Sequence, residues 1–252
     1  MKAIILAAGR GSRLKEMTDG RPKCLVELGG KPLLAWQADA LVAGGATSIV
    51  AVTGYRQDLI EAHGFPTRHN PDWQTTNMVA SLLCAADLID EPVIISYSDI
   101  VYSAAAVGRM CESEAELGVA YDRDWLGLWQ QRFDDPLSDA ESFRLGKNHR
   151  LAEIGSKVEN LDEIEGQYMG SLRISPDALG WIRQTIDADA GSSARLDMTA
   201  LLSLLINAGQ AVTGIDVTGN WCEIDTQRDL AVAEQMVSDG RLSPTPEKTT
   251  AP

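Results

Sequence analysis

Short apolar runs alternate with amphipathic stretches through the first half of this 252-residue chain. The runs are continuous, which predicts strands buried on both faces, and the stretches between them have helical spacing. We expect strands at 2–7, 48–53 and 92–97, and helices at about 33–44, 56–62 and 76–89. Buried strands separated by helices are typical of a parallel sheet with helices on both faces. The pattern therefore predicts an α/β fold with a mostly parallel sheet.

The middle of the chain has a different pattern. After a helix at about 103–115 and a strand at 117–121, short segments near 142–145, 151–154 and 166–174 predict antiparallel strands. Helices near 176–187, 197–208 and 226–238 and a strand at 211–217 follow. We expect a single domain over 1–240, with a small β-rich insertion at about 122–175, and a disordered tail at 241–252.

Composition narrows the class of partner. The chain is 44% hydrophobic and 23% charged, as in soluble globular proteins, and its net charge of −14 argues against the basic face that nucleic-acid binding requires. We find no apolar run near the roughly 20 residues of a membrane span, and no secretory signal. The four scattered cysteines predict reduced thiols and a cytoplasmic protein. The oligomeric state stays open, a homodimer included.

The loop after the first strand carries the most informative chemistry. Gly9 and Gly11 allow backbone N–H groups to approach an anion closely, while Arg13 and Lys23 supply positive charge. A dinucleotide-binding loop would need a third small residue where this chain has Leu14, and a Walker loop would need Gly-Lys-Ser/Thr. A glycine turn without a ligand remains the alternative. The two cations favour a polyphosphate site.

Several motifs together resemble a known family. Residues 6–14 (LAAGRGSRL) followed by Pro22–Lys23 resemble the signature of the nucleotidyltransferases that include the sugar-1-phosphate pyrophosphorylases. The later motifs resemble the branch of phosphocholine and 2-aminoethylphosphonate-type cytidylyltransferases: Thr76–Met78 with Ser81–Leu82, Tyr97–Asp99, Glu153–Gly155, Gly166–Gly170, Asp197–Thr199 and Trp221–Thr226. The resemblance spans about residues 2–230. It implies a Rossmann-like fold of the nucleotide-diphospho-sugar transferase type.

The resemblance also implies an activity and a set of site residues. The activity is transfer of CMP from CTP to a small phosphorylated or phosphonate amino alcohol, with release of pyrophosphate. The nucleotide-binding residues would be Leu6, Ala8, Gly9, Gly11, Arg13, Lys23, Asn77 and Ser81, and the catalytic residues Arg13, Lys23 and Lys157. Lys23 would reach the α-phosphate region and Lys157 the acceptor phosphate. Helix capping is the simpler role for Asn77 and Ser81. For Lys157 the simpler interpretation is a solvated lysine in a loop.

Two aspartates are the candidate metal ligands. Asp99 follows an apolar strand, and Asp225 lies just before a helix. Each has a simpler role as a turn or capping residue. Two such carboxylates can also hold one Mg²⁺, which prefers oxygen ligands and bridges substrate phosphates. The resemblance assigns this pair to Mg²⁺, the expected cofactor.

The acceptor site is the least defined. Tyr121, Trp125, Trp129 and Phe133 recur every four residues, which would align them on one helical face. Such a stripe is more often core than ligand site. The alternative is that some of these rings wall a pocket for a cationic group by cation–π contact, with Trp129, Tyr168 and Asp197 as the acceptor-binding residues. Nearby carboxylates that would add attraction are Asp122, Asp124, Asp139 and Glu141.

The expected chemistry needs few groups. A phosphate monoester loses its second proton with a pKa of about 6, so the attacking oxygen is already ionised at neutral pH and needs no general base. The site must relieve repulsion between two anions and stabilise the leaving group. Two alternatives remain open from the sequence: a sugar-1-phosphate nucleotidyltransferase, and a non-catalytic nucleotide-binding regulatory module.

Overall fold

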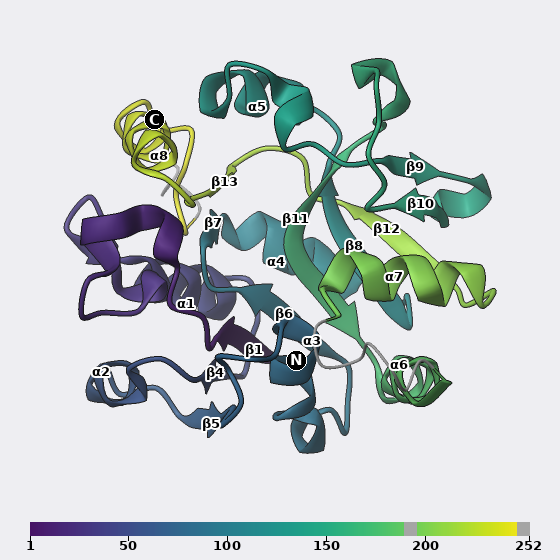
Figure 1. Cartoon of the computed structure of the whole chain (residues 1–252), viewed down its shortest axis with the longest axis horizontal. Helices are drawn as coiled ribbons and strands as arrows, with labels where there is room; N and C mark the ends of the chain where they lie inside the picture. The colour runs from purple at the N-terminus through teal and green to yellow at the C-terminus, as the bar shows by residue number, and fades with distance from the viewer. Residues whose placement is uncertain (189–195, 246–252) are drawn as a thin grey trace, which may run out of the picture.

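A seven-stranded sheet forms the centre of the computed structural model, which describes residues 1–188 and 196–245 (Figure 1). The strand order is β12-β8-β11-β6-β1-β4-β5. The strands are β1 (Lys2–Ala7), β4 (Ser48–Thr53), β5 (Thr67–His69), β6 (Val93–Tyr97), β8 (Leu117–Asp122), β11 (Gln167–Ile174) and β12 (Val212–Asp216). β11 runs antiparallel to both of its neighbours, and the other pairings are parallel. The α/β class with a mostly parallel sheet is confirmed.

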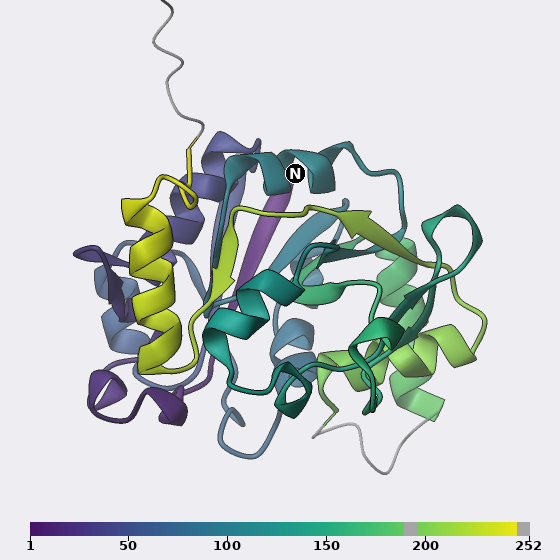
Figure 2. The same cartoon turned by 90° about the horizontal axis from the view of Figure 1, so that it is seen from above.

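Helices cover both faces of this sheet. They are α1 (Leu33–Ala43), α2 (Gln57–Ala62), α3 (Met78–Leu83), α4 (Ala104–Glu112), α5 (Leu126–Arg132), α6 (Pro176–Ala188), α7 (Met198–Asn207) and α8 (Gln227–Ser238). α1 packs against α4, and α6 packs against α7. Figure 2 shows the first pair on one side of the sheet and the second pair on the other. The helix expected at 76–89 is shorter than predicted, because it ends at Leu83 and a 3-10 turn, η3 (Ala86–Leu88), follows.

Shorter elements complete the chain. Three two-stranded antiparallel sheets pair β2 (Glu27–Leu28) with β3 (Lys31–Pro32), β7 (Ile100–Tyr102) with β13 (Trp221–Glu223), and β9 (Phe143–Leu145) with β10 (Leu151–Ile154). The remaining 3-10 turns are η1 (Ser12–Thr18), η2 (Lys23–Leu25), η4 (Pro136–Ser138), η5 (Lys147–His149) and η6 (Leu161–Glu163). The β9–β10 pair confirms two of the short antiparallel strands, whereas the β7–β13 pair was not predicted.

Three sequence-based expectations differ from the structure. β11 lies in the middle of the main sheet and is buried from Met169 to Ile174, so the insertion ends before Gln167 and not at about 175. Tyr121 lies in β8 and α5 begins only at Leu126, so the four spaced aromatic residues do not share one helix.

The expected tail is the third difference. Leu242 is 2% exposed, and the backbone N–H of Ala104 donates to the carbonyl of Pro244 at 3.0 Å, so the chain packs on the fold beyond residue 241. Residues 246–252 of that predicted tail lie outside the described residues.

The structure also shows the state of the cysteines and the lengths of the helices. Cys24, Cys84, Cys111 and Cys222 are all free, and Cys24 and Cys222 are buried. None of the helices in the described part of the chain is long and apolar enough to cross a membrane.

Candidate active site

Three parallel strands bring the predicted site residues to one edge of the sheet. β4, β1 and β6 lie side by side in the same direction, so their carboxyl ends meet, and ligand sites of open α/β sheets form at such an edge. The glycine loop follows β1 there, and Asp99 follows β6. Lys23 reaches the same place from the 3-10 turn η2 and is 6% exposed.

Gly11 explains how the loop and Lys23 share this space. Its φ is +74°, in the left-handed region that favours glycine, and a Cβ at this position would lie 2.5 Å from the Cβ of Lys23. The loop backbone therefore packs directly on the lysine side chain. Thr18 also holds the loop in place, because its hydroxyl donates to the Gly11 carbonyl at 3.0 Å.

Three carboxylates gather beside the lysine. The β7–β13 pairing sets Glu223 opposite Ile100, and the backbone N–H of Ile224 donates to the Asp99 carbonyl at 2.8 Å. Side chains alternate along an extended chain, so Glu223 and Asp225 face the same side while Ile224 points into the core. One oxygen each of Asp99, Glu223 and Asp225 lies within 4.8 Å of the others.

Asp99 and Asp225 were predicted as metal ligands from the sequence, whereas Glu223 was not. The missed signal was available in the sequence, because acidic residues at 223 and 225 flank an apolar residue with the period of a strand. What the sequence did not indicate was the pairing of this segment with residues 100–102, which brings it to Asp99.

Two cations neutralise part of this cluster. The Lys23 Nζ donates to Asp99 Oδ2 at 2.9 Å and also bonds Asp225, while Arg13 Nη1 lies 2.5 Å from Asp225 Oδ2. Burial alone would raise the pKa of Asp225, but the charges of Lys23 and Arg13 hold it below its usual value. Burial would lower the pKa of Lys23, but the two aspartates hold it above its usual value. Asp225 and Lys23 are therefore both charged at neutral pH.

The carboxylate cluster fits a divalent ion. Its donors are carboxylate oxygens, which Mg²⁺ prefers, and Asp99 Oδ1 is buried without a hydrogen-bond partner among the described residues. Such an oxygen would be satisfied by a cation. Metal binding by Asp99 and Asp225 stays a prediction, and Glu223 lies close enough to join them.

Glu223 differs from Asp225 in the direction of its pKa shift. Burial raises its pKa to about 7, and the nearby charge of Arg132 opposes that rise. Arg132 Nη2 lies 2.9 Å from Glu223 Oε2, with the arginine side chain 1% exposed. Arg132 is a second site residue that the sequence analysis did not name.

The remaining predicted nucleotide residues lie at the same edge of the sheet. Leu6 and Ala8 are buried around the end of β1. Asn77 caps α3 by accepting from its first backbone amide at 2.8 Å. Ser81 accepts at 3.0 Å from Asn70, whose backbone N–H donates to the end of β4 at 2.7 Å. Asn77 thus has the predicted capping role, and nucleotide recognition by these residues stays a prediction.

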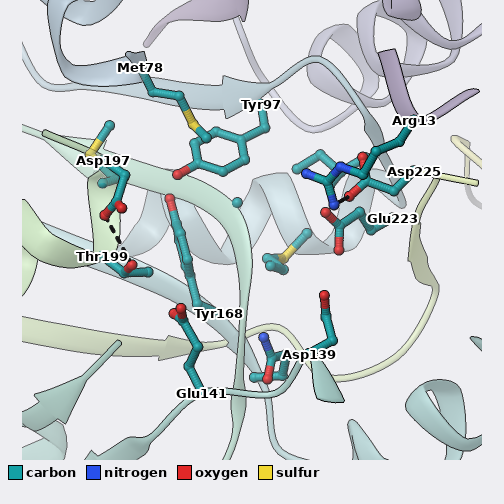
Figure 3. A pocket seen from close by; sticks show the side chains of 15 residues that line it. Arg13, Met78, Tyr97, Asp139, Glu141, Tyr168, Asp197, Thr199, Glu223 and Asp225 are labelled. Carbon is teal, nitrogen blue, oxygen red and sulfur yellow. Dashed lines mark hydrogen bonds and ion pairs between the residues drawn. The ribbon is translucent and has the colours of Figure 1, made fainter. Parts of the chain in front are cut away.

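A cavity of about 330 Å³ opens beside the carboxylate cluster (Figure 3). In Figure 3, Arg13, Glu223 and Asp225 lie at one end and Asp197, Thr199 and Glu141 at the other. Tyr97 and Tyr168 stand between the ends with their hydroxyls directed toward each other. Their rings meet edge to face, with centroids 5.8 Å apart.

Gly170 makes room for this pair of rings. Its φ is +83°, and a Cβ there would lie 2.8 Å from Cδ2 of Tyr97. Burial raises the pKa of both tyrosines, so both are neutral hydroxyl groups at physiological pH. The predicted acceptor residue Tyr168 is therefore part of the cavity wall.

Acidic groups surround the far end of the cavity. Glu141 and Asp197 line it, and burial raises the pKa of Glu141. Asp139 lines the cavity nearer to Glu223 (Figure 3). Asp197 is also the N-cap of α7, where its Oδ1 accepts from the Ala200 amide at 2.8 Å and from the Thr199 hydroxyl at 3.2 Å. The cavity thus offers an anionic end to a ligand that begins at the carboxylate cluster.

The other acids named from the sequence lie elsewhere. Asp122 Oδ2 accepts from the indole N–H of Trp221 at 2.8 Å, so it satisfies a buried donor. Asp124 lines a separate cavity of about 360 Å³ on the outer side of Trp221 and does not line the candidate acceptor cavity.

Trp129 requires a correction. It is 1% exposed and is not among the residues that line the cavity, so the expected contact with the acceptor is wrong for this arrangement. Its ring packs edge to face on Trp125, and the Arg132 guanidinium lies 4.5 Å from its centroid. The core interpretation of the aromatic stripe holds at this position because the ring supports a buried arginine instead of facing a ligand.

Lys157 lies at the edge of the site. It is exposed in the loop after β10 and does not line the cavity. The carbonyl of Ser156 accepts from the Ser142 amide at 2.8 Å. This hydrogen bond holds the backbone beside Lys157 next to the segment that carries Glu141. Its contact with an acceptor phosphate stays a prediction.

Comparisons with known proteins place the chain in a family. The model of the MobA-like NTP transferase domain matches residues 3–136. The chain is 35% identical to the CTP:phosphoglutamine cytidylyltransferase of Campylobacter jejuni, over 92% of this chain and 98% of that protein. It is 26% identical to the UTP–glucose-1-phosphate uridylyltransferase AglF of Haloferax volcanii, over 95% of this chain and 97% of that protein.

A solved structure shows the same fold. The CTP:phosphocholine cytidylyltransferase of Streptococcus pneumoniae superposes with a TM-score of 0.69 at 21% identity, covering 94% of this chain and 98% of that one. The resemblance inferred from the motifs is confirmed, and so is the nucleotide-diphospho-sugar transferase type of fold.

Proposed function

The chain belongs to the family of MobA-like NTP transferases and is a nucleotidyltransferase, and from that premise we propose which reaction it catalyses. The reaction is transfer of CMP from CTP to a small phosphorylated or phosphonate acceptor that carries an ammonium group, with Mg²⁺ as cofactor. The observation that supports it is one continuous cavity, with the carboxylate cluster and its cations at one end and acidic side chains at the other.

The glycine loop, Arg13 and Lys23 form the phosphate end. The loop amides and Arg13 would hold the β- and γ-phosphates, and the Lys23 ammonium would donate to the α-phosphate region. Asp99, Glu223 and Asp225 would hold Mg²⁺. When bound, the ion would screen the repulsion between the two anionic substrates and offset charge on the departing pyrophosphate.

The bond changes need no proton transfer. An ionised oxygen of the acceptor forms a bond to the α-phosphorus, and the bond from that phosphorus to the oxygen bridging the β-phosphate breaks. The electron pair leaves with pyrophosphate. Because the attacking oxygen is already ionised near neutral pH, the chain's role is to hold two anions in line and stabilise charge.

The far end of the cavity favours an ammonium on the acceptor. Glu141 and Asp197 are hydrogen-bond acceptors and anions, and the Tyr168 ring adds an aromatic edge to the same space. An amino group with N–H donors satisfies such carboxylates, whereas sugar hydroxyls would leave their charge without a counter-charge. The C. jejuni relative, which is named for phosphoglutamine, suggests that amino-acid phosphates belong in the test set.

A sugar phosphate is the second candidate, because the relative from H. volcanii is named for glucose 1-phosphate. The deciding experiment measures pyrophosphate release with each of CTP, UTP, ATP and GTP against five acceptors. These are phosphocholine, 2-aminoethylphosphonate, phosphoglutamine, 2-hydroxyethylphosphonate and glucose 1-phosphate. We expect release with CTP and an acceptor that carries an ammonium group.

Other outcomes would replace the proposal. Turnover confined to glucose 1-phosphate would show a sugar nucleotidyltransferase, and turnover of 2-hydroxyethylphosphonate at the rate of its amino analogue would remove the ammonium requirement. Binding of CTP without release of pyrophosphate from any pair of substrates would favour a regulatory module.

The proposal places this reaction in the cytoplasm. The four free thiols support that location, because thiols stay reduced there.

A further inference from the structure

Arg132 is a buried cation outside the cavity that joins two acidic residues of the site segment. It ends α5, and its side chain is 1% exposed. Its Nη2 lies 2.9 Å from Glu223 Oε2, and its Nε donates to Asp229 Oδ1 at 2.9 Å. The partner residues are 91 and 97 positions away along the chain, so this contact exists only in the folded protein.

Asp229 connects Arg132 to the backbone of Asp225, a candidate metal ligand. Its Oδ2 accepts from the backbone N–H of Asp225 at 3.0 Å and from that of Thr226 at 2.8 Å. The Thr226 hydroxyl accepts from the Asp229 backbone N–H in turn, which forms a capping box at the start of α8. Arg132 therefore touches the side chain of Glu223 directly and steadies Asp225 through Asp229.

Aromatic rings fix the guanidinium in this position. Its central carbon lies 4.5 Å from the centroid of Trp129 and 5.0 Å from that of Phe133. A planar fork held against two rings can satisfy two carboxylates at once, which the ammonium of a lysine cannot do with the same geometry. This also gives Trp129 a physical role that does not require contact with the acceptor.

We propose that Arg132 is a positioning residue that orients Glu223 and Asp225 for binding a divalent cation. It does not line the cavity, so it acts through the carboxylates. This inference rests on the proposed metal site. Partners outside the ligand set typically change metal affinity by about 10- to 100-fold when they are removed.

The test measures Mn²⁺ binding to the full chain, by calorimetry or by the paramagnetic resonance signal of free Mn²⁺, with CTP present and no acceptor. Arg132→Met should weaken Mn²⁺ binding by about 10-fold or more, and Arg132→Lys should weaken it less, because the charge remains while the fork is lost. At saturating Mn²⁺ the rate of CMP transfer should largely recover. Unfolding temperatures check that each variant is folded.

Arg228 offers a matched control. It joins α8 to the end of α5, donating to the Gln131 carbonyl and to Asp134, both at 2.7 Å, but it is exposed, and among the described residues its guanidinium pairs with neither Glu223 nor the Asp229 carboxylate. Arg228→Met should leave Mn²⁺ affinity unchanged. Equal weakening in the Arg132 and Arg228 variants would mean a general loosening of the α5–α8 contact and would overturn the inference.

The remaining outcomes are also decisive. Unchanged Mn²⁺ affinity in both Arg132 variants would overturn the role of Arg132 while leaving the proposed metal site intact. If Arg132→Met does not fold, the lysine variant decides the question alone. Failure of the unmodified protein to bind Mn²⁺ with CTP would refute the metal site itself, and the positioning role with it.

Discussion

The Lys23 ammonium lies between Asp99 and Asp225, 2.9 Å from the first and bonded to the second. The same lysine is the predicted donor to the α-phosphate region. Its side chain is therefore a counter-ion for the carboxylates in the free protein, and it would have to share or leave them when a cation binds. This arrangement would link nucleotide binding to metal binding through one residue.

Replacing the lysine should separate these two roles. We expect Lys23→Met to lower the rate of CMP transfer by at least about 100-fold, because a charged donor to the transferred group is lost. The same variant should bind Mn²⁺ more tightly than the unmodified protein when CTP is absent, because Nζ no longer competes for the oxygens of Asp99 and Asp225. Calorimetry with Mn²⁺ alone measures this.

A distant lysine supplies the control for that experiment. Lys31 pairs with Asp39 on the surface, so Lys31→Met should change neither the rate nor Mn²⁺ affinity. Unchanged Mn²⁺ affinity in Lys23→Met would show that the lysine does not compete with the ion.

The metal ligands themselves should be indispensable. Asp99→Asn and Asp225→Asn should each lower turnover by more than about 100-fold, which exceeds the usual effect of losing an outer-shell partner. The fold should persist, as judged by circular dichroism, because an amide can still accept from Lys23. Near-normal rates in Mg²⁺ for either variant would contradict the metal assignment.

Glu141 should show opposite effects on binding and on stability. Loss of a charge-assisted hydrogen bond costs about 1.5–3 kcal/mol, so Glu141→Gln should raise the KM for an ammonium-bearing acceptor by about 10-fold or more. Its unfolding temperature without ligand should rise slightly, because burial raises the pKa of Glu141 and its charge therefore disfavours folding. Steady-state kinetics and thermal unfolding measure the two effects.

The pH dependence of that stability difference has a definite sign. A raised pKa in the folded state means that the folded protein binds the proton more tightly than the unfolded chain. The advantage of Glu141→Gln is therefore largest above the folded pKa and declines as pH falls toward the unfolded value of about 4.3. An advantage that is constant or grows toward acid pH would contradict the raised pKa.

Gly11 should be intolerant of a Cβ. Gly11→Ala adds a clash with Lys23 to the cost of a positive φ, and we expect it to destabilise the fold by about 1–3 kcal/mol and to weaken CTP binding. Gly20 has nearly the same φ, +77°, with nothing within 4 Å of the Cβ position. Gly20→Ala thus isolates the cost of the φ angle, about 1–2 kcal/mol. Equal urea midpoints for the two variants would show that the Lys23 contact is unimportant.

Local patterns in the sequence predicted much of the fold. Continuous apolar runs marked β1, β4 and β6 almost to the residue, because a strand covered by helices on both faces must be apolar throughout. The glycine loop and the residues Arg13, Lys23, Asp99 and Asp225 were also evident, since each lies within or beside a short motif. These features depend on neighbours a few positions away.

Contacts between distant segments decided the rest. Glu223 became a member of the carboxylate cluster only through the pairing of β13 with β7, and Arg132 became its partner only when α5 packed beside α8. The aromatic spacing from 121 to 133 favoured one helix, but Tyr121 lies in β8 and is part of the main sheet. The sequence by itself therefore determined the strands β1, β4 and β6, the glycine loop and the reaction family, whereas tertiary structure decided which buried charges meet, because the energy of such pairs depends on desolvation and distance that no local pattern encodes.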